Sequence, residues 1–312
     1  PINPGQQVLA GVVQPIPDQS QTFKQFQPKI SLRYEVSDNA NLYANWGIGF
    51  KSGGFNNQGS AAIVDQAFND FIGTNVLIND QFEKETSSAF EAGFKWQGLD
   101  GRLSIDGAGY YTSVDDMQFF EFFVGSFGLL RVVSNIDEVD IYGAELAVNL
   151  RANDWLTVYA AGNVTDSEIK ANTSRPETVG NKSPYTADYT LNFGAEIDTP
   201  IAGDWNFVAR ADYGIVGPTW FHTVQDETRP TVFEPLLPGL GTADYSISQR
   251  DAYGVLNIRA GVENERFAIT GFVRNATNTQ VIEEIIPAPE FGGLFVQPGA
   301  LRLYGAELKV KF

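Results

Sequence analysis

Few side chains in this sequence have the types and spacing that catalysis requires. The single histidine is His222, and Asp226 and Glu227 are the nearest residues that could join it as metal ligands. One imidazole beside two carboxylates, in a segment between strands, favours an ordinary loop residue or part of a ligand-contacting surface over a metal centre.

Two pairs of adjacent acidic residues, Asp115-Asp116 and Glu283-Glu284, could suggest general acid/base chemistry. Neighbouring residues on a strand point to opposite faces, so such pairs do not converge on one substrate. The glycine-rich stretches Gly47-Ile48-Gly49 and Lys51-Ser52-Gly53-Gly54 could suggest phosphate binding, but neither opens a helix, which that mechanism requires. The sequence therefore predicts no enzyme activity, no catalytic residue, no resident metal and no cofactor.

Aromatic side chains are the better functional candidates. Several lie where predicted strands meet longer connections, and flat rings of this kind can hold a metal chelate or a sugar. The candidate ligand-binding residues are Phe55, Asn56, Phe120, Phe122, Trp220, Phe221 and His222. In the other interpretation, most of these rings belong to an aromatic girdle at a membrane surface. The sequence leaves both interpretations open.

Composition narrows the class of protein. The 312 residues carry a formal net charge of −17, and no basic stripe is present, which argues against a nucleic-acid partner. The chain has no cysteine, so a disulfide framework and a thiolate metal site are both excluded. No apolar run approaches the ~18 residues of a membrane helix. If the chain lies in a membrane, it must do so as a closed β-barrel.

Alternation of apolar and polar residues with a period of two runs along the whole chain and predicts about eleven strands. The alternating runs are residues 30–36, 42–50, 90–96, 102–123, 142–150, 156–164, 185–198, 205–216, 254–263, 267–274 and 301–312. The predicted fold class is all-β, an antiparallel up-and-down transmembrane barrel. An odd number of strands cannot close such a barrel with antiparallel neighbours, so we expect the chain to be part of a larger one.

The connections between these runs also alternate in length. Short turns are expected at 37–40, 98–101, 153–154, 200–204 and 264–266, and longer links near 51–84, 124–130, 170–184, 217–251 and 281–299. One end of the sheet then carries tight turns, and the other carries mostly long loops. Outer-membrane barrels have this asymmetry, with short turns on the periplasmic side and long loops outside.

The last strand and an internal repeat support the same fold. Leu308, Val310 and Phe312 alternate with two lysines, and a final aromatic residue is typical of the strand that closes a barrel. The last strand of a soluble sandwich would look similar. An aromatic-Gly-Ala-Glu pattern recurs at 142–145, 193–196 and 304–307. We expect each of its glycines to face the lumen, where a neighbouring side chain can lie flat against the wall.

Taken in order, these segments resemble the C-terminal half of the barrel of TonB-dependent outer-membrane receptors. The segments that carry the resemblance are residues 43–56, 85–95, 116–118, 134–145 and 273–278, together with the terminal Phe312. The resemblance implies a barrel of about 22 strands with a plug inside it. It implies residues 28–312 as the C-terminal portion of the barrel and residues 1–27 as an extracellular loop or extended lead-in. The plug and the segment that contacts TonB would precede Pro1 in the parent protein.

The resemblance also implies function and partners. A receptor of this family imports a scarce, bulky nutrient, a ferric siderophore-like chelate above all, with energy from the TonB complex passed through the plug. Its surroundings would be outer-membrane lipid of a Gram-negative bacterium. The assembly machinery would recognise Gly305, Leu308, Val310 and Phe312. The alternatives are a passive substrate-specific porin, which lacks a plug, and a soluble all-β binding domain.

Overall fold

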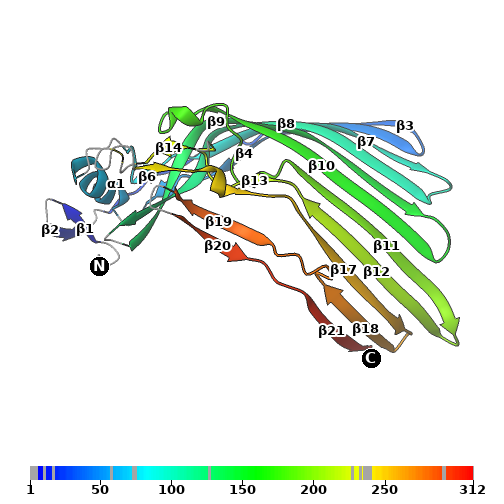
Figure 1. Ribbon diagram of the computed structural model, residues 1–312. Helices are drawn as coiled ribbons and strands as arrows, with labels where there is room; N and C mark the ends of the chain where they lie inside the picture. Colours follow the sequence, from blue (N-terminus) through cyan, green and yellow to red (C-terminus); the bar gives the residue numbers. More distant parts are fainter. Residues whose placement is uncertain are drawn as a thin grey trace.

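The computed structural model describes residues 6–9, 12–15, 18–56, 59–71, 76–125, 128–225, 228–231, 234, 241–289 and 293–311. Eleven antiparallel strands form one sheet, which curves into an open trough (Figure 1). The all-β fold and the strand count are therefore confirmed. The strands, in chain order, are β3 (Lys29–Ser37), β4 (Ala40–Lys51), β7 (Glu85–Gly98), β8 (Leu103–Gly125), β9 (Gly128–Arg151), β10 (Leu156–Ala171), β11 (Tyr189–Ala202), β12 (Trp205–Val216), β17 (Tyr253–Glu263), β18 (Phe267–Arg274) and β21 (Leu303–Val310). The edge strands β3 and β21 do not meet, so the sheet is not closed.

The connections are sorted by length, as the sequence predicts, with the short turns at one end of the trough and the longer links at the other (Figure 1). One expected link is wrong. The segment 124–130 is not a long loop, because β8 and β9 stay paired from Leu103 with Leu150 up to Gly125 with Gly128. Apolar residues near the tip of this hairpin are buried against the loops, which explains why the strands continue beyond the sheet.

The longer links and the segment before β3 contain short elements of their own. These are β1 (Gln6–Leu9), β2 (Val12–Pro15), β5 (Gly54–Phe55), α1 (Ser60–Val64), the π-helical turn Asp65–Asp70, β6 (Gln81–Phe82), the 3-10 turns Pro176–Thr178 and Ser246–Ser248, β13 (Thr219–Trp220), β14 (Arg229–Pro230), β15 (Thr242–Ala243), β16 (Gln249–Arg250), β19 (Ile282–Ala288) and β20 (Gly293–Pro298). Within the described ranges, no helix is long and apolar enough to cross a membrane.

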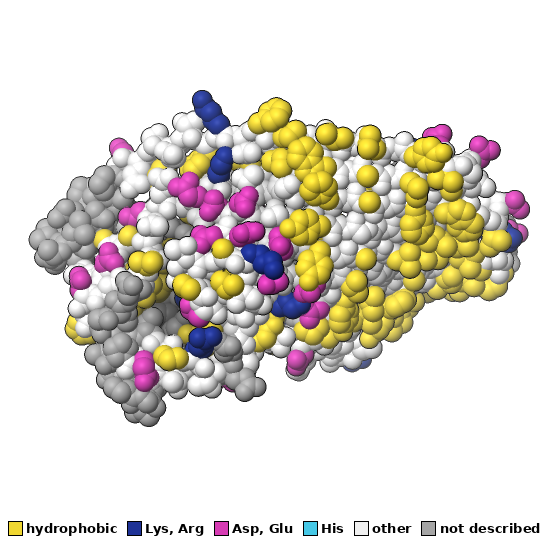
Figure 2. Space-filling model, turned by 90° about the horizontal axis from the view of Figure 1, so that it is seen from above, with side chains coloured by type: hydrophobic (Ala, Val, Ile, Leu, Met, Phe, Trp, Pro, Cys, Tyr) yellow, Lys and Arg dark blue, Asp and Glu magenta, His cyan; other side chains and the backbone are white. Residues whose placement is uncertain are grey.

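The two faces of the sheet differ in chemistry. The pairing register places Trp46, Phe90, Tyr111 and Tyr142 side by side on the outer face. Trp46 is half-buried, but the other three rings are exposed, with Phe90 at 52%. Figure 2 shows apolar side chains along the wall, and acidic and basic ones gathered nearer the loop end. Soluble monomers rarely expose apolar patches of this extent, whereas lipid covers them.

The inner face is polar, and its charged residues come from strands across the whole trough. Arg33, Glu91, Glu145, Arg210 and Glu307 all lie on this face. Along β10, Val158 pairs with apolar outer-face residues of both neighbouring strands, and Thr157 lies on the inner face. This alternation is the one that a barrel with a wet lumen requires.

The aromatic-Gly-Ala-Glu repeat has a structural reason on the inner face. In four strand pairs, an aromatic ring lies directly over the glycine paired with it on the next strand. These pairs are Tyr43 with Gly93, Tyr110 with Gly143, Tyr159 with Gly194, and Phe272 with Gly305. A Cβ atom at any of the four glycines would meet the ring, so glycine is required there.

The buried core lies at the loop end, not inside the trough. Ile63, Val64 and Phe68 pack against Phe123 and Leu130 near the tip of the β8–β9 hairpin. A second cluster contains Val114, Phe119, Ile136, Val139 and Ile169. The loop end is thus a packed layer attached to the wall. Phe312 lies outside the described residues, and β21 pairs with β18 as far as Val310.

Candidate ligand-binding rim and lumen wall

The predicted ligand-binding residues lie in three regions of the loop end. Phe55 ends β5 and Asn56 follows it, Phe120 and Phe122 lie on the extended part of β8, and Trp220, Phe221 and His222 follow β12. The structure joins the third group, through the ring of Tyr185, to Phe119 of β8. Phe120 does not take part in this cluster, because it points to the opposite face of the strand from Phe119.

A chain of aromatic rings joins the β8 hairpin to two loops. The rings of Phe119 and Tyr185 have centroids 6.3 Å apart, and those of Tyr185 and Phe221 are 5.0 Å apart and edge to face. Phe221 is 3% exposed, so its ring packs within the layer. Partial burial raises the pKa of the Tyr185 hydroxyl above its usual range. Tyr185 carries no signal in the sequence that marks it as part of this cluster.

His222 is part of the same packed layer. Its side chain is 6% exposed, the backbone N–H of Val224 donates to Nδ1 at 3.0 Å, and the ring lies 5.3 Å from the ring of Tyr245. Asp226 and Glu227, its candidate metal-binding neighbours, lie outside the described residues. In the part of the chain that the structure describes, no group of three or more His, Asp or Glu side chains is placed to hold a metal ion.

Asn56 uses its buried amide to attach a loop to the wall. Its Nδ2 donates to the carbonyl oxygens of Asn79 at 2.8 Å and Val133 at 2.9 Å, and its Oδ1 accepts from the N–H of Val133 at 2.9 Å. Val133 belongs to the extended part of β9. These bonds fix the segment between β4 and β7 against that strand.

Phe120 is the most accessible of the predicted aromatic residues in the β8 hairpin. Its ring is 38% exposed, and the guanidinium carbon of Arg131 lies 3.8 Å from the ring centroid. A cation over an aromatic face is attracted by the ring quadrupole. Phe55, Phe122 and Trp220 are half-buried. The Phe120–Arg131 pair therefore offers an exposed flat surface and a positive charge together.

Arg250 connects two of the loops. Its guanidinium lies 5.3 Å from the ring centroid of Phe221 and 4.9 Å from that of Tyr253. It donates to Thr219 Oγ1 at 2.8 Å and to the carbonyl oxygen of Ile282 at 3.1 Å, at the start of β19. The sequence gives no sign of this role, because both hydrogen-bond partners lie more than thirty positions away along the chain.

The lumen wall carries a charged network of its own. Arg210 donates from Nε to Asp212 at 3.0 Å and from its terminal nitrogen to the hydroxyl of Tyr159 at 2.8 Å, and that hydroxyl donates to Asp212. A hollow of about 300 Å³ lies beside this network, lined in part by Arg259, Arg274 and Glu307. Such a surface can make charge-assisted hydrogen bonds of either sign with a partner in the lumen.

A curved antiparallel sheet with an apolar outer face, a polar inner face and loops sorted to one end is the wall of a transmembrane β-barrel. The sequence model of the family described as "TonB dependent receptor-like, beta-barrel" matches residues 5–276. The chain belongs to this family of TonB-dependent receptor barrels.

Solved structures agree at the level of the fold. The ferric yersiniabactin uptake receptor FyuA from Yersinia pestis has a TM-score of 0.65 and 20% identity, and the match covers 91% of this chain and 37% of FyuA. The copper transporter OprC has a TM-score of 0.61 and 16% identity, and the match covers 91% of this chain and 39% of OprC. The ferripyoverdine receptor of the outer membrane of Pseudomonas aeruginosa has a TM-score of 0.59 and 12% identity, and the match covers 95% of this chain and 34% of that receptor.

The chain corresponds to only part of each of these proteins, since it spans less than two fifths of their length. All three are receptors or transporters and not enzymes, in keeping with the absence of a predicted catalytic centre. Their ligands differ, since two carry ferric chelates in their names and one is named for copper. At this level of identity the shared fold does not identify a ligand.

Proposed function

We propose that this chain is the C-terminal part of the barrel of a TonB-dependent receptor in the outer membrane of a Gram-negative bacterium. The parent protein imports a scarce, bulky nutrient, and the class that we favour is a ferric siderophore-like chelate. The observation that carries the proposal is the two-faced wall of eleven strands, which is capped at one end by packed loops and belongs to the receptor-barrel family.

The partners follow from this architecture. The polar inner wall would face a plug contributed by the rest of the parent protein, and the TonB complex would act through that plug. The apolar outer wall would contact membrane lipid. Strand β21, with Gly305, Leu308, Val310 and Phe312, would be the segment that the assembly machinery recognises. Deleting Phe312 should then lower the amount of receptor in the outer membrane at unchanged transcript level. If the deletion variant assembles at the normal level, the strand contributes only to packing.

For the ligand, we assign the first contact to Phe120 with Arg131. Phe55, Phe122 and Trp220 would supply further apolar surface. Aromatic rings recognise bulky, flat or cyclic ligands, and a guanidinium favours ligands that carry carboxylate or other negative oxygen atoms. Asn56, Phe221 and His222 would act from within the layer, by holding the loops in position beneath the ligand.

Uptake in the host tests the proposal. A strain that lacks the full-length gene is grown under iron limitation with ferric catecholate, hydroxamate or carboxylate chelates, and with copper limitation as a separate arm. We expect growth on one ferric chelate class to be lost and to be restored by the full-length gene only when TonB is present. Restoration without TonB would identify a passive porin, and unchanged growth in every arm would contradict the proposal.

A residue-level test uses two phenylalanine substitutions. Phe120→Ala removes the exposed ring at the rim, and we expect it to weaken binding of the active chelate by about 0.5–2 kcal/mol, or roughly two- to thirtyfold. Phe193→Ala is the matched control, because Phe193 is similarly exposed but lies on the outer wall. Equal effects of the two substitutions on chelate binding would remove Phe120 from the proposed site.

A further inference from the structure

The charged hollow of the inner wall lies where β12, β17, β18 and β21 run side by side (Figure 1). Arg210 of β12, Arg259 of β17 and Phe272 of β18 are paired in one row across the sheet. Arg274 is two positions beyond Phe272 on the same strand, so it lies on the same face. Three neighbouring strands thus bring three guanidinium groups to one place on the wall.

Two of these guanidinium groups lack a compensating carboxylate. Arg210 donates to Asp212 of its own strand at 3.0 Å. Among the described residues, neither Arg259 nor Arg274 forms an ion pair, and the guanidinium of Arg274 lies 5.5 Å from the ring centroid of Phe272. Arg210 and Arg259 are directly opposite each other, and like charges in this position weaken a sheet. The wall therefore has a positive charge here that its described neighbours do not neutralise.

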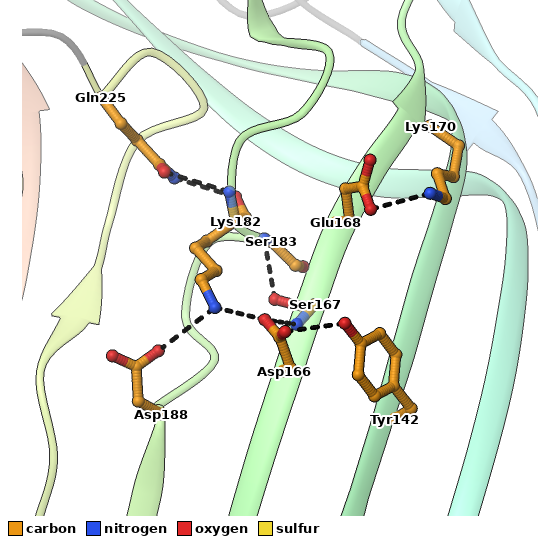
Figure 3. A network of polar contacts seen from close by, with 9 residues as sticks. All are labelled: Tyr142, Asp166, Ser167, Glu168, Lys170, Lys182, Ser183, Asp188 and Gln225. Atoms are coloured by element: carbon orange, nitrogen blue, oxygen red, sulfur yellow. Dashed lines mark hydrogen bonds and ion pairs between the residues drawn. The ribbon is translucent and has the colours of Figure 1, made fainter.

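A lysine at the loop end shows the opposite balance. The ammonium group of Lys182 forms an ion pair with Asp166 of β10 and lies 3.9 Å from Asp188, so two carboxylates surround one cation (Figure 3). Its backbone N–H donates to Oε1 of Gln225 at 3.0 Å, which holds the lysine in place. At the hollow, by contrast, three guanidinium groups accompany two carboxylates, and one of the two is already bound to Arg210.

The other polar groups of the lining indicate which kind of anion fits. Oδ1 of Asn257 accepts from the N–H of Asn275 at 3.0 Å, which leaves Nδ2 available as a donor. Glu307 also lines the hollow, and an ionised carboxylate can only accept. An anion suits both groups if it carries negative oxygens for the arginines and an O–H for Glu307. Phosphate retains at least one O–H at neutral pH, whereas sulfate and carboxylates do not.

We propose that this hollow binds one hydrogen phosphate ion between Arg259 and Arg274, with Glu307 accepting from the O–H of the ion. Guanidinium groups match phosphate oxygens in charge and geometry. A volume of about 300 Å³ is at the lower end of small-molecule sites, ~300–1,000 Å³, and suits an ion with a few waters. The inference goes beyond the proposed import of a chelate, because it assigns an inorganic anion to the wall itself.

The first test measures binding of radiolabelled inorganic phosphate. The purified full-length receptor is dialysed to equilibrium against phosphate in detergent at constant ionic strength. We expect one phosphate per receptor, and we expect Arg259→Gln and Arg274→Gln each to weaken binding roughly ten- to a hundredfold. Arg33→Gln is the matched control, because Arg33 lies on the same inner face but is paired with Glu35 at 3.5 Å. No binding, or an equal loss in the control, would overturn the site.

The second test uses sulfate as a competitor. In the parent receptor, sulfate should displace phosphate only at concentrations about tenfold higher or more, because it cannot donate to Glu307. Glu307→Gln should narrow this difference, since an amide can donate to an oxyanion. Glu145→Gln changes an inner-wall carboxylate outside the hollow and should leave the difference unchanged. Equal competition by the two anions in the parent would contradict the assignment to phosphate.

The third test asks what occupies the hollow. Urea unfolding of the full-length receptor in vesicles is compared in chloride and in phosphate at equal ionic strength. Arg259→Gln should raise the urea midpoint in chloride, because it removes the repulsion with Arg210. In phosphate it should lower the midpoint, because the parent alone gains stability from the bound ion. A lower midpoint in both buffers would show that a carboxylate of the parent protein fills the hollow, and a higher one in both would show that it is empty. Either result would overturn the phosphate site.

Discussion

Replacing Gly194 by alanine should destabilise the barrel, although alanine is normally the better strand residue. The ring of Tyr159 on β10 lies over Gly194 on β11, and an added Cβ would be 2.6 Å from Cε1 of that ring and closer still to Cζ and Oη. Ordinary carbon contacts are ~3.5–4.0 Å. Relief would require the ring to swing away, but its hydroxyl is held by Asp212 and by Arg210 at 2.8 Å.

The expected magnitude comes from two opposing contributions. Overpacking a fitted site costs ~1–3 kcal/mol. Alanine recovers ~0.5–1 kcal/mol relative to glycine, because it loses less backbone entropy on folding. The net effect of Gly194→Ala should be a loss of about 1–2 kcal/mol in the free energy of unfolding. If the ring moved away instead, its hydroxyl would lose hydrogen bonds to charged groups, which contribute ~1.5–3 kcal/mol. Moving the ring would therefore cost at least as much stability as the steric overlap.

A double-mutant cycle isolates the contact. In a Tyr159→Ala background the space above residue 194 is open, so Gly194→Ala should become stabilising by ~0.5–1 kcal/mol. The coupling energy between the two sites would then be about 1.5–3 kcal/mol. Gly271→Ala is the matched control on the same sheet, since its Cβ would meet nothing nearer than 3.9 Å.

Equilibrium urea unfolding of the full-length barrel in lipid vesicles, followed by tryptophan fluorescence, measures these free energies. The same effect of Gly194→Ala in both backgrounds would refute the proposed contact. Indistinguishable effects of Gly194→Ala and Gly271→Ala would refute it as well, because the ring of Tyr159 would then not restrict the size of the residue at position 194.

Three further predictions concern the lipid face, the loop anchor at Asn56 and the ion pair of Lys182. Val158→Arg should lower the free energy of unfolding in vesicles by ~2–4 kcal/mol, and Thr157→Arg by clearly less, because only position 158 faces lipid; equal losses would contradict the register. Asn56→Ala leaves the N–H and the carbonyl group of Val133 without hydrogen-bond partners, which costs ~1–3 kcal/mol of stability. Hydrogen exchange at the amide of Val133 should therefore accelerate, while exchange at the amides of β11 should stay unchanged. The ion pair with Asp166 raises the pKa of Lys182 above its usual range, so its stabilisation is complete below ~10.4 and is lost as pH rises through the higher folded pKa. The stability difference between Lys182→Gln and the parent should therefore be constant from about pH 5 to 9 and vanish only in strong alkali; a loss near pH 7 would assign this stabilisation to another group.

Local sequence pattern is sufficient to predict the wall of this barrel. Period-two alternation identifies each of the eleven strands because every strand has one lipid-facing and one lumen-facing side. The glycines of the repeat are also predictable, since a glycine at a fixed place in an alternating strand marks close approach by a neighbour. The sequence does not predict which aromatic ring covers each glycine, because the pairing register depends on the neighbouring strand as well.

The pattern fails where β8 leaves the sheet. Asp116 has a φ of 55°, and the buried residues change from an even position, Val114, to odd ones, Phe119 and Phe123, across it. The carbonyl of Asp116 accepts a hydrogen bond from Asn135 at 2.7 Å, which helps to hold this left-handed residue. Beyond this point, burial is set by packing against loops and not by lipid, so alternation no longer tells the two faces apart.

The loop layer is the least predictable part for a related reason. Its contacts join residues that are far apart in sequence and have no repeating period. The sequence predicts Phe221 and His222 as part of a ligand-contacting rim, yet packing on Tyr185 and Tyr245 buries them. Composition indicates that rings gather at the loop end, but only the fold separates the rings that hold loops together from those, such as Phe120, that remain accessible.

The charged hollow lies on the inner face beside the pairing of β12 with β17. In this strand pair the ring-over-glycine contact is on the outer face, where Tyr213 covers Gly254. The inner positions pair Arg210 with Arg259, two like charges directly opposite each other, an arrangement that weakens a sheet. Asp212 neutralises Arg210, but among the described residues Arg259 makes no ion pair. The wall therefore has an exposed guanidinium here, in a hollow that the ring of Phe272 and the side chains of Arg274 and Glu307 also line. This is the place where the lumen offers an unpaired charge to a partner.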